Sequence, residues 1–154
     1  TQKYVFTTEW YDIPVASTAN LISEADWQTM IAVKSAVNKQ IEAARNAKLI
    51  GSNLSAKVEL WANAELKAVL DQLDDELRFV LITSTVIVNA FNEAQGEATD
   101  LEGLRVKVSA AEGEKCARCW HVLPDVNTHH EHPGLCSRCI INLPTGQGEE
   151  RKYA

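Results

Sequence analysis

Four cysteines in the last third of the chain constrain its fold more than any other feature. They form a Cys-x2-Cys-x16-Cys-x2-Cys pattern made of Cys116, Cys119, Cys136 and Cys139. Two residues between paired thiolates let one tight turn present both sulfurs to a single ion, and two such turns complete a tetrahedron. Thiolate ligands favour zinc or iron over magnesium or calcium. Because four sulfurs leave no position for a reactive water, the pattern predicts one structural zinc ion.

Three other interpretations of the cysteines remain open. Two disulfides would require an oxidising compartment and explain the paired spacing poorly. A thioredoxin-like redox motif would require its Cys-x-x-Cys at the start of a βαβ helix, and the chain has two such pairs in one tail. Iron in the same four-sulfur site is the third alternative. Since four thiolates complete the shell, we expect exposed loop positions rather than ligation for the histidines, namely His121, His129, His130 and His132.

The charge distribution divides the 154-residue chain into two unlike parts. The formal net charge is -6, yet residues 103–154 hold seven Lys and Arg against six Asp and Glu, while residues 1–102 hold eight against fifteen. About 45% of the residues are hydrophobic and 23% are charged, which excludes a disordered chain. No apolar run reaches the roughly 18 residues of a membrane span, and no signal pattern is present. We therefore expect a cytoplasmic protein.

Residues 24–110 carry the patterns of a small α/β or α+β domain. Ser23 followed by Asp26 predicts a helix start, and Lys48 followed by Gly51 predicts its end. Further helices are expected at 65–73 and 77–82, strands at 56–61, 83–88 and 104–108, and a loop at 89–103. The long helix has apolar positions at helical spacing, namely Met30, Ile31, Val37, Ile41 and Ala44. The acidic run 74–76 is interpreted as a solvated helix start rather than a site.

Two flanking segments complete the predicted organisation. Residues 111–154 form a four-cysteine zinc-finger tail, similar to a zinc ribbon, with few large aliphatic side chains. We expect such a segment to need its metal in order to fold. Residues 1–23 are expected to form an extended segment that packs against a part outside this chain. Its apolar bulk includes Phe6, Trp10, Tyr11, Ile13 and Pro14.

Basic and aromatic side chains at the cysteines suggest nucleic acid as a partner. Arg118 and Arg138 occupy matching places between the paired cysteines, and Trp120 follows the first pair. A guanidinium group suits phosphate, and an indole ring stacks on an unpaired base. A purely structural role, with Trp120 covering the metal and both arginines solvated, explains the spacing equally well. The additional basic residues shift the balance towards nucleic acid, and they are Lys107, Lys115, Arg151 and Lys152.

The segment 113–121, Gly-Glu-Lys-Cys-Ala-Arg-Cys-Trp-His, resembles the C-terminal zinc domain of bacterial isoleucyl-tRNA synthetase. The resemblance extends to the segments 6–10, 42–45, 50–54, 75–81 and 150–154, and it therefore covers nearly the whole chain in order. It implies that residues 1–23 end a helical anticodon-binding bundle. It also implies that the zinc module helps to bind the anticodon arm of tRNA(Ile), through Arg118, Trp120, Arg138 and Lys115.

The parent enzyme of that family joins isoleucine to its tRNA using ATP. Its nucleotide-site motifs, His-Ile-Gly-His and Lys-Met-Ser-Lys-Ser, are absent here. His129 and His132 have the outer spacing of the first motif, but Glu131 stands at its glycine place, and the only methionine is Met30 between Thr29 and Ile31. We therefore expect no catalytic site in this chain and ATP binding only in the parent enzyme. The alternatives are a DNA-binding tail like that of formamidopyrimidine-DNA glycosylases and a zinc-stapled protein-interaction module. The first family acts through an N-terminal proline, whereas this chain begins with Thr1.

Overall fold

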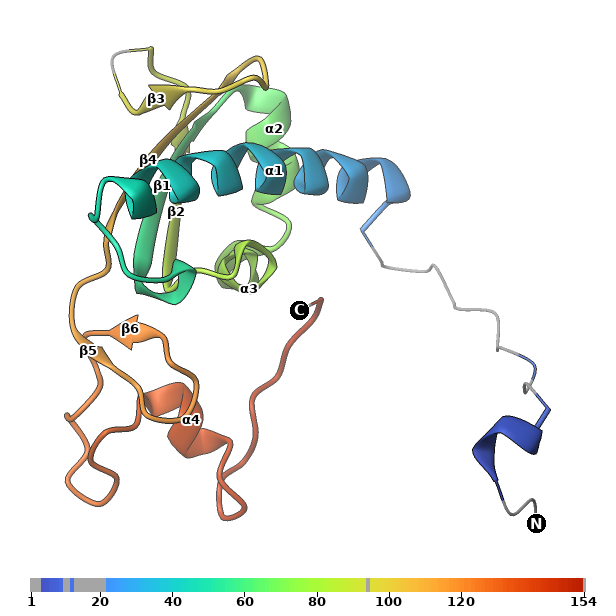
Figure 1. The fold of residues 1–154 in the computed structure, drawn as a ribbon, viewed down its shortest axis with the longest axis vertical. Coiled ribbons are helices and arrows are strands. Elements are labelled where there is room, and N and C mark those ends of the chain that lie inside the picture. Colours follow the sequence, from blue (N-terminus) through green and yellow to red (C-terminus); the bar gives the residue numbers. More distant parts are fainter. Residues whose placement is uncertain (1–3, 10–11, 13–21, 94, 154) are drawn as a thin grey trace.

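The computed structural model describes residues 4–9, 12, 22–93 and 95–153. Its main body is a four-stranded sheet covered on one face by helices, and a smaller cysteine-bearing part follows it along the chain (Figure 1). The predicted fold class, a mixed helix-and-sheet domain followed by a four-cysteine tail, is confirmed. No helix among the described residues is long and apolar enough to cross a membrane.

The long helix α1 (Glu24–Asn46) begins as the sequence predicts. Ser23 is its N-cap, and the Ser23 side chain accepts a hydrogen bond of 3.1 Å from the backbone N–H of Asp26. One face of α1 is buried, with Met30, Val33, Ala36, Val37, Ile41 and Ala44. Ile31 was expected on this face, but its side chain is 55% exposed. Successive helical residues differ by about 100°, so the neighbour of buried Met30 turns outwards.

The end of α1 differs from the expected cap at Gly51. The helix ends at Asn46, and Lys48 adopts the left-handed conformation (φ 59°) that usually favours glycine. The backbone N–H groups of Lys48 and Leu49 each donate a 2.9 Å hydrogen bond to a carbonyl of the last turn. These two bonds satisfy carbonyl groups that a helix end otherwise leaves unpaired, and they offset the cost of a lysine in this conformation.

The sheet contains β1 (Ala56–Ala62), β2 (Thr85–Ala90), β3 (Glu97–Ala98) and β4 (Leu104–Ala110) in the order β2-β1-β4-β3. β1 is parallel to β2 and antiparallel to β4, and β3 is antiparallel to β4. The three predicted strands are confirmed within two residues at each end. The short β3 lies in the segment 89–103, where only a loop was expected. Two residues give too little alternation to be read from sequence.

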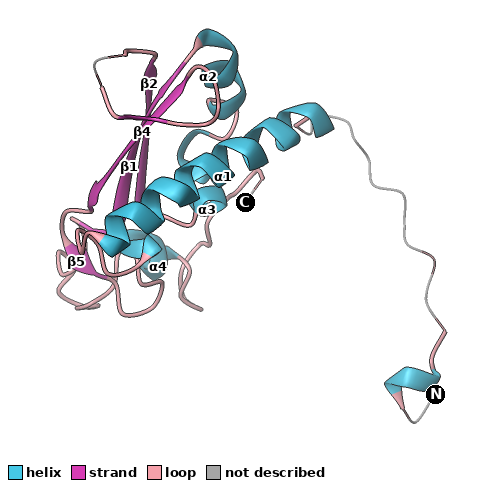
Figure 2. Cartoon of the chain, turned by 45° about the horizontal axis from the view of Figure 1, so that its top comes forward, coloured by secondary structure: helices cyan, strands magenta, loops and turns pink. Residues whose placement is uncertain are grey.

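The chain crosses from β1 to β2 through α2 (Ala64–Leu70), a 3-10 turn (Asp74–Glu76) and α3 (Leu77–Leu81). These helices lie on the same face of the sheet as α1 (Figures 1 and 2). The acidic run therefore stands at a helix start, as expected. Between sheet and helices lies one core, whose largest fully buried side chains include Met30, Ile41, Leu60, Leu70 and Leu77.

Residues 114–141, called the cysteine module below, follow β4. The module contains an antiparallel hairpin of β5 (Glu114–Lys115) and β6 (Val122–Leu123) and the helix α4 (Ser137–Ile141). Ser84, immediately before β2, joins the module to the sheet. Its hydroxyl accepts a 2.7 Å hydrogen bond from the backbone N–H of Val122 and donates a 2.5 Å bond to the carbonyl of Leu54.

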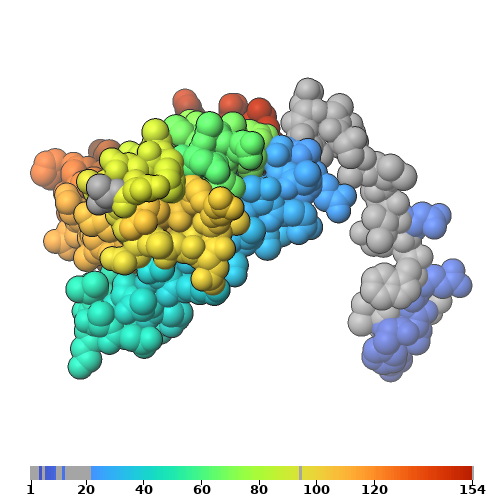
Figure 3. All heavy atoms as spheres, turned by 90° about the horizontal axis from the view of Figure 1, so that it is seen from above, coloured from blue at the N-terminus to red at the C-terminus, as the bar shows by residue number. Residues whose placement is uncertain are grey.

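After the module, residues 142–153 return to the main body. This C-terminal segment ends beside α3 (Figures 1 and 3). The Glu76 carboxylate accepts hydrogen bonds from the backbone N–H groups of Lys152 (2.5 Å) and Tyr153 (2.6 Å). The side chain of Tyr153 packs against the main core. The module is thus held to the sheet-and-helix body at its entry, through Ser84, and again after its exit.

Most of the expected extended segment 1–23 lies outside the described residues, including Trp10, Tyr11, Ile13 and Pro14. Within it, Val5–Thr7 forms a single 3-10 turn and the Phe6 side chain is 82% exposed. The predicted division of the chain at residues 23 and 110 stays a prediction.

Candidate metal centre

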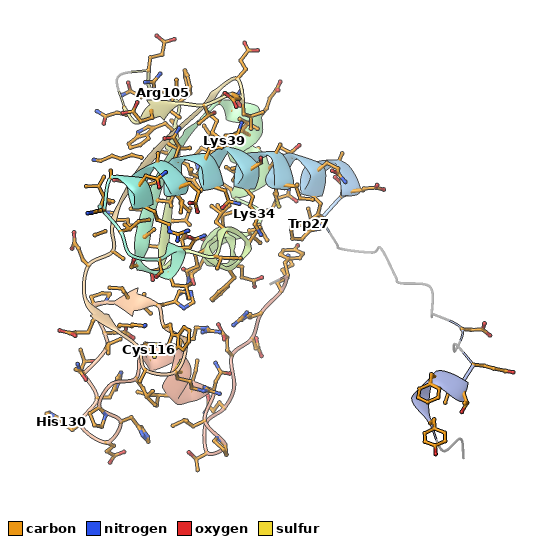
Figure 4. All side chains as sticks on the ribbon, viewed as in Figure 1. Trp27, Lys34, Lys39, Arg105, Cys116 and His130 are labelled. Atoms are coloured by element: carbon orange, nitrogen blue, oxygen red, sulfur yellow. The ribbon has the colours of Figure 1, made fainter. Side chains whose placement is uncertain are left out.

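The four cysteine sulfurs converge in the cysteine module. The Sγ atoms of Cys116, Cys119, Cys136 and Cys139 all lie within 4.8 Å of one another. Cys116 and Cys136 are fully buried, and Cys139 is 2% exposed. Figure 4 shows Cys116 inside the module and His130 at its outer edge. The fold therefore brings together the four cysteine side chains that the sequence pattern predicted as metal ligands.

The sulfur spacing fits a metal better than a disulfide. The Sγ atoms of Cys119 and Cys136 are 3.7 Å apart, and no disulfide joins the four cysteines. Zinc–sulfur bonds of about 2.3 Å in a tetrahedron place the sulfurs about 3.8 Å apart, whereas a disulfide requires about 2.05 Å.

Backbone geometry builds the first pair of ligands. The N–H of Trp120 donates to the carbonyl of Cys116, and the N–H of Cys116 donates to the carbonyl of His121, both at 2.9 Å. Trp120 adopts φ 67°, which closes this tight turn. The preceding Gly113 has φ 112°, and a Cβ there would lie 2.3 Å from the backbone of Leu123. Glycine is therefore required where the hairpin strands approach each other.

The second pair stands at the start of α4. Cys136 is the N-cap of this helix, and its backbone N–H points at the Cys116 sulfur, 3.4 Å away. The Asp125 carboxylate accepts a 2.7 Å hydrogen bond from the backbone N–H of Ser137, in the first turn of α4. Although burial by itself raises the pKa of Asp125, hydrogen bonds from Ser137 hold it below its usual range. A carboxylate at this position favours the helix start.

The electrostatics of the cluster are consistent with a bound cation. Burial disfavours a thiolate at Cys116, but N–H groups of Cys119, Cys136 and Arg118 outweigh it and lower the Cys116 pKa to about 6. Burial and the neighbouring sulfurs raise the pKa of Cys139, and burial raises that of Cys136. The pKa of the Cys116 thiol is thus lowered, while the pKa values of Cys136 and Cys139 are raised. A divalent metal ion removes this conflict, since coordinating thiols lose their protons.

Apart from the cysteines, the module has only a minimal apolar interior. Val126 is its one buried aliphatic side chain among the described residues, and Leu123 and Leu135 are partly buried against the cluster. This is far less apolar burial than in the main body. The residues present therefore fit a metal that supplies the cohesion the module lacks.

The side chains predicted to contact nucleic acid form two groups. Trp120 is 59% exposed, and the Lys115 ammonium lies 4.9 Å from the centre of its ring. Arg118 donates a 3.0 Å hydrogen bond from Nη1 to the carbonyl of Cys139. Arg138 donates from Nε to the Glu149 carboxylate at 2.9 Å and lies over the Phe79 ring. The two arginines occupy matching sequence positions but have different surroundings.

His121 corrects the expectation that the histidines are exposed. It is 7% exposed and meets the Phe79 ring edge-on, with centroids 5.8 Å apart. Burial and the positive charges of Arg78 and Arg138 lower the pKa of His121, so its ring is neutral near pH 7. The other three histidines lie in the loop as expected, with His129 and His130 exposed and His132 half-buried.

Sequence reasoning missed the contribution of α3 and the C-terminal segment to the site. Phe79 lies beneath the arginines, Glu149 bridges them, and Ser84 holds the hairpin. No local pattern identifies these residues, because Ser84 bonds to Val122, 38 positions along the chain, and Phe79 contacts Arg138, 59 positions along the chain.

Comparison with known proteins identifies the type of zinc finger and the proteins that the chain resembles. Residues 113–141 match the zinc finger found in FPG and IleRS, so the module is a four-cysteine zinc finger of that type. The chain is 79% identical over all 154 residues to isoleucine--tRNA ligase of Acinetobacter baylyi. It is 47% identical over 153 residues to that of Actinobacillus pleuropneumoniae serotype 5b and 47% identical over 150 residues to that of Saccharophagus degradans.

The chain spans 16% of the length of each of these relatives. It corresponds to the C-terminal region of isoleucine--tRNA ligase with its zinc finger. The resemblance seen in the sequence is therefore confirmed. Because similarity to the ligases extends over the whole chain, beyond the finger found in both FPG and IleRS, it favours the ligase over a formamidopyrimidine-DNA-glycosylase-like protein.

Proposed function

We propose that the cysteine module binds one structural zinc ion and helps to hold the anticodon arm of tRNA(Ile) during ATP-dependent aminoacylation by the whole ligase. The observation that carries the proposal is an exposed Trp120 beside basic side chains on a metal-fixed turn, in a chain similar throughout to isoleucine--tRNA ligases. The zinc ligands are Cys116, Cys119, Cys136 and Cys139.

When bound, zinc supplies rigidity rather than reaction chemistry, because four thiolates leave no open position. The chain's own residues do the binding. Trp120 is held by its N–H bond to the Cys116 carbonyl, and its ring offers a surface for an unpaired base. Lys115, over the same ring, adds a positive charge for the RNA backbone. Arg118 and Arg138 add planar donors for phosphate oxygens.

Charge is consistent with a module that positions tRNA but does not capture it alone. Residues 1–102 are net acidic, which gives little long-range attraction for RNA. The remaining affinity and the catalytic site would reside in the other parts of the ligase. Cytoplasmic location and the anticodon-binding bundle as the neighbour of residues 1–23 belong to the same proposal.

The test compares Trp120→Ala and Arg118→Ala in the whole ligase. We expect the tRNA concentration needed for half-maximal charging to rise roughly tenfold for Trp120→Ala, since one base stack contributes about 1–3 kcal/mol. Isoleucine-dependent ATP–pyrophosphate exchange should not change. The matched control is Phe91→Ala, which removes another exposed aromatic ring (40% exposed) outside the module and should leave charging unaffected.

Two results would contradict the proposal. Normal charging by both the Trp120 and the Arg118 variant would leave these side chains a structural role only. Equal salt-dependent affinity for duplex DNA and tRNA(Ile) would favour the DNA-binding alternative, and binding to neither would favour a protein-interaction module.

A further inference from the structure

The four cysteines differ in their access to solvent. Cys116, Cys136 and Cys139 are buried, whereas Cys119 is partly exposed. A pocket of about 640 Å³ opens on this side of the cluster, with Cys119 and Cys139 in its wall. Because Cys139 is only 2% exposed, Cys119 is the cysteine that a small molecule in the pocket meets first. The cluster therefore presents one cysteine to dissolved reagents and shields the other three.

The wall of this pocket is rich in positive charge. Its charged side chains, besides the cysteines, are Arg118, Arg138, Arg151 and Glu149. The Glu149 carboxylate accepts hydrogen bonds from Nε of Arg138 at 2.9 Å and from Nε of Arg151 at 3.2 Å, and it holds both side chains in the wall. Positive charge beside a sulfur stabilises the negative charge that develops on a leaving oxygen when the sulfur attacks a peroxide.

A second sulfur lies directly against Cys119. The Sγ atoms of Cys119 and Cys136 are 3.7 Å apart, and the two residues belong to different cysteine pairs. Cys136 is fully buried, so its sulfur meets the sulfur of Cys119 rather than a reagent in solvent. A disulfide forms when one sulfur attacks another sulfur that carries a leaving group. The fold thus places a reaction partner behind the one cysteine that solvent reaches.

We propose that Cys119 is a site of reversible oxidation by hydrogen peroxide, and that Cys136 closes a disulfide on it. In the first step the Cys119 thiolate sulfur attacks one peroxide oxygen. An S–O bond forms, the O–O bond breaks, and the released hydroxide takes a proton from solvent, which leaves a sulfenic acid on Cys119. In the second step the Cys136 thiolate sulfur attacks the Cys119 sulfur. An S–S bond forms, the S–O bond breaks, and a second hydroxide becomes water, so the peroxide gains the two electrons that the sulfurs lose.

Oxidation of this pair removes two of the four metal ligands, and this consequence rests on the zinc site of the proposed function. Only Cys116 and Cys139 then remain as thiolates. Among the described residues, Val126 is the one buried aliphatic side chain that could keep the module folded without its metal. The turn that holds Trp120 is part of this module. A peroxide-treated ligase should therefore lose zinc and need more tRNA for charging, until a thiol reductant reverses the disulfide.

The test treats the zinc-loaded chain with hydrogen peroxide and follows zinc release with a colorimetric chelator. The chain has four cysteines, so mass spectrometry of its peptides assigns the disulfide, which we expect between Cys119 and Cys136. A thiol reductant should restore zinc binding, because it reduces a disulfide but not a sulfinic or sulfonic acid. Cys119→His keeps a zinc ligand without a thiol and should slow zinc release about tenfold or more. The matched control is Cys139→His, which keeps the reacting pair and should release zinc at nearly the wild-type rate.

A charge variant tests the pocket itself. Arg118→Gln should slow zinc release about 2- to 5-fold, whereas Arg45→Gln on α1 removes the same charge far from the cysteines and should not change it. A disulfide in any other pairing, or release from Cys119→His at the wild-type rate, would overturn the inference. If the histidine variants bind no zinc, the disulfide mapped in the wild-type chain decides. A chain without zinc before treatment contradicts the proposed function, whereas a zinc-loaded chain whose four thiols resist peroxide overturns this inference alone.

Discussion

Ser84→Ala tests how firmly the cysteine module is fixed to the sheet. The Ser84 side chain is 1% exposed and joins the two parts through bonds of 2.7 Å from the Val122 N–H and 2.5 Å to the Leu54 carbonyl. Alanine removes both bonds at a position that solvent barely reaches. The half-buried Val122 N–H and Leu54 carbonyl then each lose a hydrogen bond, at about 1–2 kcal/mol apiece, so the free energy of unfolding should fall by about 2–4 kcal/mol.

Urea unfolding of the zinc-loaded chain measures this loss. With a slope of about 2 kcal/mol/M, the midpoint should fall by about 1–2 M. Hydrogen exchange at the Val122 amide should accelerate by more than tenfold, because this amide loses its acceptor. Ser35→Ala is the matched control, since Ser35 is exposed on α1 and the change should alter stability by less than about 0.5 kcal/mol. A shift no larger than that of the control, with unchanged Val122 exchange, would refute the reasoning.

Three further predictions concern the module and its anchors. A zinc chelator should unfold residues 114–141 and leave α1 and the four-stranded sheet intact, because Val126 is the only buried aliphatic side chain described in the module. Circular dichroism and amide exchange would measure this unfolding, and a module that stays folded without metal would contradict the prediction. Gly113→Ala should weaken zinc binding and stability by about 2 kcal/mol or more, because its Cβ meets the Leu123 backbone at 2.3 Å, whereas Gly148→Ala has a similar positive φ and open space and should cost about 1 kcal/mol. Burial by itself raises the pKa of Glu149, but hydrogen bonds from Arg151 and Arg138 hold it below its usual value of 4.5. The difference in free energy of unfolding between the wild-type chain and Glu149→Gln should therefore be fully present above about pH 5 and disappear as the pH falls through the lowered pKa. Urea unfolding at several pH values measures this difference, and a difference that does not change with pH would contradict the prediction.

Features carried by neighbouring residues could be predicted from the sequence. Ser23 with Asp26 located the start of α1, alternation located β1 and β4, and the cysteine spacing located the metal cluster. In each case the signal lies within one element or one repeated spacing. The expected cap at Gly51 was wrong because Lys48 takes the left-handed position instead, and no propensity rule favours lysine there.

Features carried by tertiary contacts could not be predicted in this way. His121 was expected in an exposed loop because four thiolates already complete the metal shell, yet it is buried and meets the Phe79 ring of α3 edge-on. Arg118 and Arg138 looked equivalent, since each stands between paired cysteines. Only the returning C-terminal segment, with Glu149, makes the surroundings of Arg138 different.

The same returning segment explains how a small metal site can present a defined surface. Zinc coordination makes the turn rigid, but it does not by itself fix how the turn is oriented relative to the rest of a large enzyme. Ser84 fixes the hairpin where the chain enters the module, and Glu76 holds the backbone of Lys152 and Tyr153 after the chain leaves it. Phe79 of α3 contacts Arg138 of the module and Arg151 of the C-terminal segment through its ring. The orientation of Trp120 is thus set by contacts to β2 and α3 as well as by the metal, so variants at Ser84 or Glu76 should impair tRNA charging while zinc remains bound.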